Sequence, residues 1–110
     1  MTKDTEKALI IIYCQYKKRL SLGTDEEEAR YFEDAKLRNI DNFSNWPQSK
    51  LNLSTQQLHK EGYIFKNIFD DVRLLNEGIQ FVESKPKEYF DSFLNAVSGL
   101  ASIVSAIFPH

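Results

Sequence analysis

The stretch LHKEGYIFKNIFDDVRLLNEGIQFVES, residues 58–84, constrains the fold of this 110-residue chain more than any other. Its first part reads as a helix that ends at Gly62, and its last part as a second helix that starts at Asn76. Between them, the segments YIFKNIF and VRLL are rich in β-branched and aromatic residues and flank the pair Asp70-Asp71. This pattern is typical of a short antiparallel hairpin. The stretch therefore predicts a helix, a hairpin and a helix in immediate succession.

Two further helices are predicted at the N-terminal end. The first runs from Asp4 or Thr5 to Leu20, because its apolar residues recur at helical spacing. These residues are Ala8, Leu9, Ile12, Tyr13 and Tyr16. The second helix starts at the capping box Thr24-Asp25-Glu26-Glu27 and turns its apolar residues toward the core. Those residues are Phe32 and Ala35, with Ala29 and Ile40 as further candidates.

The helix that ends at Gly62 is the third along the chain. Its predicted cap is Ser44 or Asn45, and Pro47 lies in its first turn. One face, spaced by four and three residues, is expected to be buried and consists of Leu51, Thr55 and Leu58. The polar residues away from that face are Gln48, Asn52, Gln56, Gln57 and His59.

A last helix is predicted after the break at Ser84-Lys85-Pro86, with Pro86 in its first position. From there its apolar residues follow a heptad pattern. They are Phe90, Phe93, Leu94, Val97, Leu100, Ala101, Val104 and Ile107. This face is wider than a small core needs and would be costly to leave in water, so we expect a two-fold interface of a homodimer. The alternative is that the helix folds back over the first helix and covers its own core.

Three helices followed by a hairpin form the order of a winged helix-turn-helix domain. The length fits one domain. The expected fold class is α+β, mostly α, with the winged-helix domain at residues 1–84. The C-terminal helix at residues 85–110 belongs to the same domain, where it either dimerises or covers the core.

The residues around the hairpin also resemble a known family. The sequences LHKEGYI and LNEGIQFV are similar to those of small bacterial and phage winged-helix proteins, including the YjcQ-like group. There the recognition helix ends in a Leu-Lys-x-x-Gly-Tyr-Ile type of sequence, and the wing returns into a Leu-Thr-x-x-Gly-x-x-Phe-Leu type. The matching residues here are Leu58, Glu61, Gly62, Tyr63, Ile64, Leu75, Gly78, Phe81 and Val82. Asn76 stands where that family usually has Thr, and it can still cap a helix. The resemblance implies a small transcriptional regulator that binds double-stranded DNA.

The third helix and the hairpin supply side chains suited to DNA. Amides can pair with adenine in the major groove, and basic groups neutralise phosphates. The candidate DNA-binding residues are Gln48, Ser49, Lys50, Asn52, Gln56, Gln57, His59, Lys60, Lys66 and Arg73. Against this, the net charge is −2, and Asp70 and Asp71 at the hairpin tip would repel a phosphate. The alternative is a protein-interaction module that has kept the scaffold and lost the DNA face.

Catalysis finds no support in the sequence, so we expect no enzyme, no cofactor and no metal. His59 and His110 lack the spacing of zinc ligands, and neither a nucleophile elbow nor a phosphate-cradling glycine loop occurs. Cys14, the one cysteine, is expected to be a buried thiol in a cytoplasmic protein without a signal peptide. A membrane role is not expected, because the apolar part of the last helix is at the short end for a span.

Overall fold

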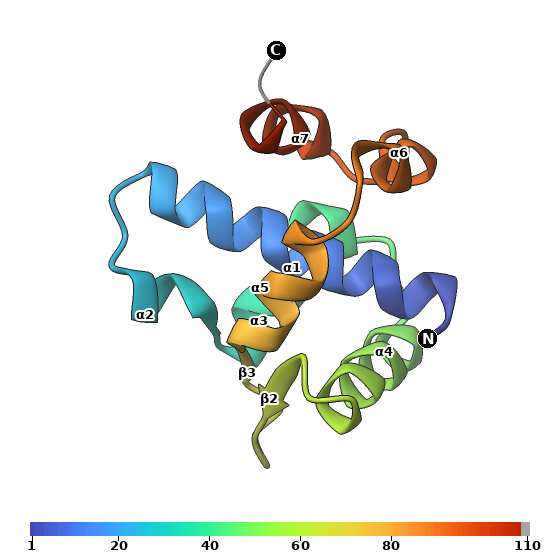
Figure 1. Ribbon diagram of the computed structural model, residues 1–110. Coiled ribbons are helices and arrows are strands. Elements are labelled where there is room, and N and C mark those ends of the chain that lie inside the picture. The colour runs from blue at the N-terminus through green and yellow to red at the C-terminus, as the bar shows by residue number, and fades with distance from the viewer. Residues whose placement is uncertain (109–110) are drawn as a thin grey trace.

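The computed structural model describes residues 1–108, which form a mostly helical α+β structure with one small antiparallel sheet (Figure 1). The predicted class is thereby confirmed at the level of α+β, mostly α. In chain order the elements are α1 (Lys3–Ser21), α2 (Glu26–Arg30), β1 (Tyr31–Phe32), α3 (Asp34–Arg38), η1 (Asp41–Phe43), α4 (Gln48–Lys60), β2 (Ile64–Lys66), β3 (Val72–Leu74), α5 (Asn76–Glu83), α6 (Lys87–Phe90), η2 (Asp91–Phe93) and α7 (Leu100–Ile107).

Helix α1 is the centre of the core. It begins after Thr2, whose side-chain oxygen accepts a hydrogen bond from the Thr5 amide at 3.1 Å. Residues 8–14 are all buried, so this part of the helix is covered on every side rather than along one stripe. The cover comes from α2, α4, α5 and α7, which all contact α1. The predicted first helix is confirmed, although its cap is Thr2 rather than Asp4 or Thr5. Cys14 is buried, which raises the pKa of its thiol to about 12.

The second predicted helix is wrong as a single element. It divides into α2 and α3, separated by strand β1, and its cap is Asp25 rather than Thr24. Ala29 and Phe32 are buried as predicted, and Ile40 is half-buried, but Ala35 is exposed and Leu37 takes the inward position.

The division of the second helix follows from tertiary contacts around β1. The Arg19 guanidinium donates to the carbonyl oxygen of Tyr31 at 2.6 Å and lies over the Phe32 ring at 4.1 Å. The strand also pairs with β3. These non-local contacts outweigh the local helix signal.

The sheet has the strand order β1-β3-β2 and is antiparallel throughout. The predicted hairpin is confirmed, with Ile64 opposite Leu74 and Lys66 opposite Val72. Strand β1 was not expected; it adds to the free edge of β3 and places Tyr31 opposite Arg73. The buried face of the sheet consists of Phe32, Ile64, Val72 and Leu74, so this small sheet closes one end of the core.

Helix α4 buries Leu51, Thr55 and Leu58, as predicted, and Gly62 follows it with a φ of +82°. Its expected caps are wrong, because Pro47 occupies the N-cap position and no side chain caps the helix. Helix α5 begins at Asn76, yet its cap is Leu75. The side chain of Asn76 instead accepts a hydrogen bond from Arg30 at 2.6 Å.

The predicted continuous last helix is also wrong. The chain forms α6, the turn η2 and α7, with Pro86 as the N-cap of α6 and Gly99 at φ +82° before α7. Asn42 fixes the intervening loop, because its side chain accepts from the Ser98 amide at 2.9 Å and donates to the Ser98 carbonyl at 3.2 Å. Together α6 and α7 lie on the side of α1 opposite α4 and the hairpin (Figure 1).

The C-terminal apolar residues largely cover the chain's own core. Five of the eight proposed dimer residues are buried within the chain, namely Phe90, Phe93, Val97, Leu100 and Val104. Ile107 is half-buried, and Leu94 and Ala101 are exposed. This is the arrangement expected of the fold-back alternative. It removes the reason for a dimer, which was an apolar face left in water, and the homodimer stays an untested prediction.

Candidate nucleic-acid interface

The outer face of α4 is the centre of the candidate site. Ser49, Leu53, Gln56 and Lys60 follow one another at spacings of four, three and four, and all four side chains are exposed. Asn52 is half-buried beside them. None of the thirteen residues of α4 is acidic, although the chain holds 16 acidic residues. The structure therefore presents a polar helix face whose only charges are positive.

Two of the predicted contact residues in α4 already have partners on their own chain. Gln48 accepts a hydrogen bond from Arg38 of α3 at 3.1 Å, while Arg38 also pairs with Asp34 at 2.8 Å. The Lys50 ammonium lies 3.6 Å from a carboxylate oxygen of Asp4 and 4.2 Å from the centre of the Trp46 ring. Both residues thus connect α4 to neighbouring elements at the first turn of the helix.

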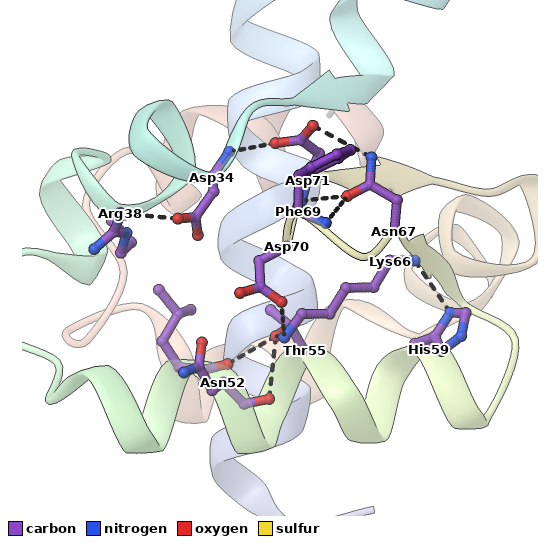
Figure 2. A network of polar contacts seen from close by, with 11 residues as sticks. Asp34, Arg38, Asn52, Thr55, His59, Lys66, Asn67, Phe69, Asp70 and Asp71 are labelled. Carbon is purple, nitrogen blue, oxygen red and sulfur yellow. Dashed lines mark hydrogen bonds and ion pairs between the residues drawn. The ribbon is translucent and has the colours of Figure 1, made fainter.

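The hairpin is fastened to α4 by Lys66 (Figure 2). Its backbone amide donates to His59 Nδ1 at 3.1 Å, and its ammonium donates to Thr55 Oγ1 at 2.9 Å. The same ammonium lies 3.6 Å from a carboxylate oxygen of Asp70. Because Lys66 and His59 are joined in this way, their first role is to hold the hairpin at a fixed place beside α4.

The loop at residues 67–71 is closed by Asn67. The side-chain oxygen of Asn67 accepts from the amides of Phe69 and Asp71, at 2.9 and 3.0 Å. Asp70, between Phe69 and Asp71, has a backbone φ of +66°. Figure 2 shows these residues over α4, with Asp71 pointing toward Asp34 of α3 and Asn67 on the side nearer Lys66 and His59. Such an Asn-centred turn gives a short loop a defined conformation.

Asp71 does not act as the repulsive tip residue that the sequence suggested. Its carboxylate accepts from the Tyr31 hydroxyl at 2.7 Å, from the Asp34 amide at 2.9 Å and from Asn67 Nδ2 at 3.2 Å. These hydrogen bonds, first among them the one from Tyr31, hold the pKa of Asp71 below its usual value. The carboxylate joins the hairpin loop to β1 and α3, and these donors stabilise its negative charge.

A groove of about 350 Å³ lies between α4 and the loop. It is lined by Asn52, Gln56, His59, Lys66, Asn67 and Asp70. Five of these six residues can donate hydrogen bonds, and the sixth, Asp70, is the one paired with Lys66. The groove therefore brings together predicted residues from the helix and the hairpin.

The apolar side chains on this side of the molecule were missed by sequence reasoning. Ile68 is 90% exposed, Phe69 72% and Leu53 68%, and Phe65 is also exposed. The run YIFKNIF suggested one long strand, but β2 ends at Lys66, so Ile68 and Phe69 fall in the loop. Phe65 lies opposite Arg73 and packs edge-on against the His59 ring, with 5.5 Å between the ring centres.

The basic side chains do not gather into one free patch. Arg73 pairs with Glu27 at the other end of the sheet from α4, and Lys17 lies 3.8 Å from Glu83 of α5. The Arg19 guanidinium donates a hydrogen bond to the Tyr31 carbonyl oxygen. With Lys50 and Lys66, four basic side chains are thus paired with carboxylates of the same chain, and Arg19 is bonded to a backbone carbonyl. Exposed ion pairs contribute little free energy, so a phosphate could replace the acidic partner of Lys17, Lys50 or Arg73 at small cost.

Two other kinds of site, a metal centre and a membrane span, find no support in the described residues. Within residues 1–108, no group of three or more His, Cys, Asp or Glu side chains could hold a metal ion. His110 lies outside the described part of the chain. None of the helices in that part combines the length and the hydropathy that a membrane span requires. In the comparisons with known proteins, no family model, no curated protein and no solved structure matches this chain.

Proposed function

We propose that this chain is a winged helix-turn-helix protein that binds double-stranded DNA through α4 and acts in the cytoplasm as a small transcriptional regulator. The order α1-β1-α3-α4-β2-β3 and the strand order β1-β3-β2 support this assignment, with α2 as an additional turn. In such a domain α3 and α4 form the helix-turn-helix, α4 is the recognition helix, and the β2–β3 hairpin is the wing. The resemblance to YjcQ-like proteins favours the same assignment.

The observation that carries the proposal is the charge and polarity of α4. In a chain of net charge −2, this 13-residue exposed helix holds no acidic residue and two lysines. DNA phosphates repel carboxylates and attract basic groups, so a helix without carboxylates is suited to approach the duplex. Helix α2, by contrast, carries Glu26, Glu27 and Glu28.

Each outward side chain of α4 has a role in this proposal. Asn52 and Gln56 can read adenine through two hydrogen bonds, and Leu53 can contact a thymine methyl group. Lys60 is exposed and has no ion-pair partner among residues 1–108, so it serves as a phosphate contact. Ser49 lies on the same stripe and can donate to a base or a phosphate.

The test is the anisotropy of labelled duplexes, first a random pool and then a site selected from that pool. Asn52→Ala and Gln56→Ala are each expected to weaken the selected site by about 5- to 100-fold and to relax its sequence preference. Lys60→Ala is expected to weaken selected and random duplexes alike. Gln80→Ala on α5 and Lys87→Ala on α6 remove exposed groups of the same kinds elsewhere and should bind like the wild type. Equal affinity of all five variants for the selected site contradicts the proposal.

A protein-interaction module is the second candidate, and the ion pairs that four basic side chains make within the chain favour it. A surface that uses its cations on its own carboxylates has fewer of them for phosphates. This candidate predicts no duplex binding at low salt and a stable protein complex recovered from the native cell. Recovery of nucleic acid alone would count against it.

A further inference from the structure

We propose that Ile68 and Phe69 form an apolar wedge that enters the minor groove beside the α4 site and opens one base step there. This inference rests on the DNA binding proposed above and adds a mechanism to it, namely that the chain bends the duplex it binds. Proteins that insert apolar side chains between base pairs kink the duplex by roughly 20–90°. This apolar wedge, also called the apolar tip, consists of Ile68 and Phe69 in the loop at residues 67–71.

The exposure of these two side chains calls for an explanation. Ile68 is 90% exposed and Phe69 72%, and they are neighbours at the end of the hairpin. Single exposed apolar residues are common on protein surfaces, but two large consecutive ones in a hairpin loop form a surface that gains free energy when it is covered. Neither residue contributes to the buried core.

The loop holds the two side chains in a defined position. The Asn67 side chain closes the turn by two hydrogen bonds, the Asp70 amide donates to the Asn67 carbonyl at 3.0 Å, and the Asn67 amide donates to the Asp71 carbonyl at 3.1 Å. Asp71 in turn anchors the loop to Tyr31 and Asp34. A wedge that is already ordered loses little conformational entropy when it enters a groove. These hydrogen bonds therefore hold Ile68 and Phe69 in exposed positions.

The position of Ile68 and Phe69 relative to α4 supports DNA as the ligand that covers them. Lys66 fastens the hairpin to Thr55 and His59 in the middle and last turns of α4, so the tip and the helix face are presented together (Figure 2). When α4 lies in the major groove, one sugar-phosphate strand separates it from the minor groove on that side. The groove of about 350 Å³ between α4 and the loop is where that strand would pass.

The chemistry of that groove suits a phosphate strand. Asn52, Gln56, His59, Lys66 and Asn67 line it with donors, and the one acidic residue, Asp70, is paired with Lys66. Asp71 is turned toward β1 and α3, away from this path. A protein partner that covered the apolar tip would have no need for this row of donors between the tip and a helix free of acidic residues.

The experiment uses the full chain and duplexes of about 30 base pairs with a fluorescence donor and acceptor at their ends. Energy transfer reports bending, and anisotropy of the same duplexes reports binding. The double variant I68S F69S removes the apolar tip while the loop hydrogen bonds, which come from backbone amides and Asn67, are kept. Leu22→Ser is the matched control, because Leu22 is 76% exposed in the turn between α1 and α2.

The wild type and Leu22→Ser are expected to raise energy transfer on binding. I68S F69S should still bind, with an affinity lower by about tenfold, and leave the duplex straight. Binding without bending by the wild type, or bending by the double variant equal to that of the wild type, overturns the wedge while the proposed function stands. Absence of duplex binding by the wild type overturns both, and a protein retained by the wild type but not by I68S F69S would then assign the tip to protein docking.

Discussion

At the scale of single residues, Asp71 is a surface carboxylate that the fold uses as an acceptor for three donors. Its pKa is lowered by these hydrogen bonds, so its contribution to stability is present above the ordinary pKa of an aspartate, about 3.9. That contribution is lost as the pH falls through the lowered pKa of the folded state. We therefore expect the urea midpoint of the wild type to fall more steeply than that of Asp71→Asn between about pH 5 and pH 2.

The control for this pH dependence is Asp91→Asn, which removes an exposed carboxylate that makes no side-chain hydrogen bond with residues 1–108. Its urea midpoint should follow the pH profile of the wild type. Parallel profiles for the wild type and Asp71→Asn would mean that the three hydrogen bonds do not stabilise the charged form of Asp71.

A substitution at Asp70 is expected to strengthen DNA binding. Its carboxylate lines the groove between α4 and the loop, where a phosphate strand is proposed to pass. Asn is nearly the same size and tolerates the positive φ of +66° at this position. Asp70→Asn is therefore expected to strengthen duplex binding by about fivefold, since removal of one like charge near a phosphate is worth about 1 kcal/mol. Anisotropy at low salt measures it, and weaker binding by the variant would place the DNA elsewhere.

The packing around Gly78 leaves no room for a side chain. A Cβ atom there would overlap the carbonyl oxygen of Tyr63 and lie 2.9 Å from Leu74 Cδ1, so α5 could not keep its contact with the hairpin. Gly78→Ala is expected to lower the free energy of unfolding by about 1–3 kcal/mol. At Gly62 a Cβ would meet nothing within 4 Å, and only the φ of +82° matters. Gly62→Asn should therefore cost less than about 1 kcal/mol in the same urea titration. The reverse order of the two variants would contradict this account.

At the scale of elements, local signals predicted those elements whose structure depends on local contacts. The approximate extent of α1, the buried face of α4 and the hairpin all follow from spacing and turn residues. Strand β1 could not be found this way, because Tyr31 and Phe32 become a strand only by pairing with Arg73 and Val72, far along the chain. The acidic capping signal at Thr24 to Glu27 then suggested one helix where tertiary pairing produces two.

The same reasoning explains which parts of the candidate site were predicted. The polar residues of α4 were found because helical spacing separates them from the buried face. Leu53, Ile68 and Phe69 were missed, because apolar residues in a helix or a strand-like run are normally assigned to a core. The sequence does not show that the strand ends at Lys66, since Asn67 closes the loop through bonds that depend on its exact conformation.

The C-terminal elements give the prediction at this scale. Phe93 is fully buried near α1, with the Lys3 ammonium 4.5 Å from its ring centre, whereas Leu94 is 37% exposed. Phe93→Ala is expected to lower the free energy of unfolding by about 3–5 kcal/mol, and Leu94→Ala by less than about 1 kcal/mol. Urea titration with light scattering separates stability from assembly. If Phe93→Ala instead left stability unchanged and halved the mass, the segment would be a dimer interface.

At the scale of the whole molecule, the charge distribution sets how strongly the chain can hold DNA. The net charge is −2, and most of the basic side chains near α4 and the wing are shared with carboxylates of the same chain. The proposed DNA binding would therefore depend on a few phosphate contacts together with base contacts of α4 and the apolar tip. Such a protein would discriminate between sites by shape and direct contacts more than by general attraction to DNA.

This balance predicts a shallow salt dependence. A single chain that engages two or three phosphates should show a slope of about −2 to −3 in a plot of log affinity against log salt. That slope corresponds to a loss of affinity of about 15- to 65-fold between about 50 and 200 mM salt. Because the C-terminal apolar face is mostly covered within the chain, light scattering should give the mass of one chain without DNA. A slope of about −5 or steeper with a doubled mass on DNA would instead mean that two copies bind together, each neutralising its own phosphates. A slope near zero would mean that the chain contacts no phosphates, and it would contradict the proposed placement of α4 in the major groove.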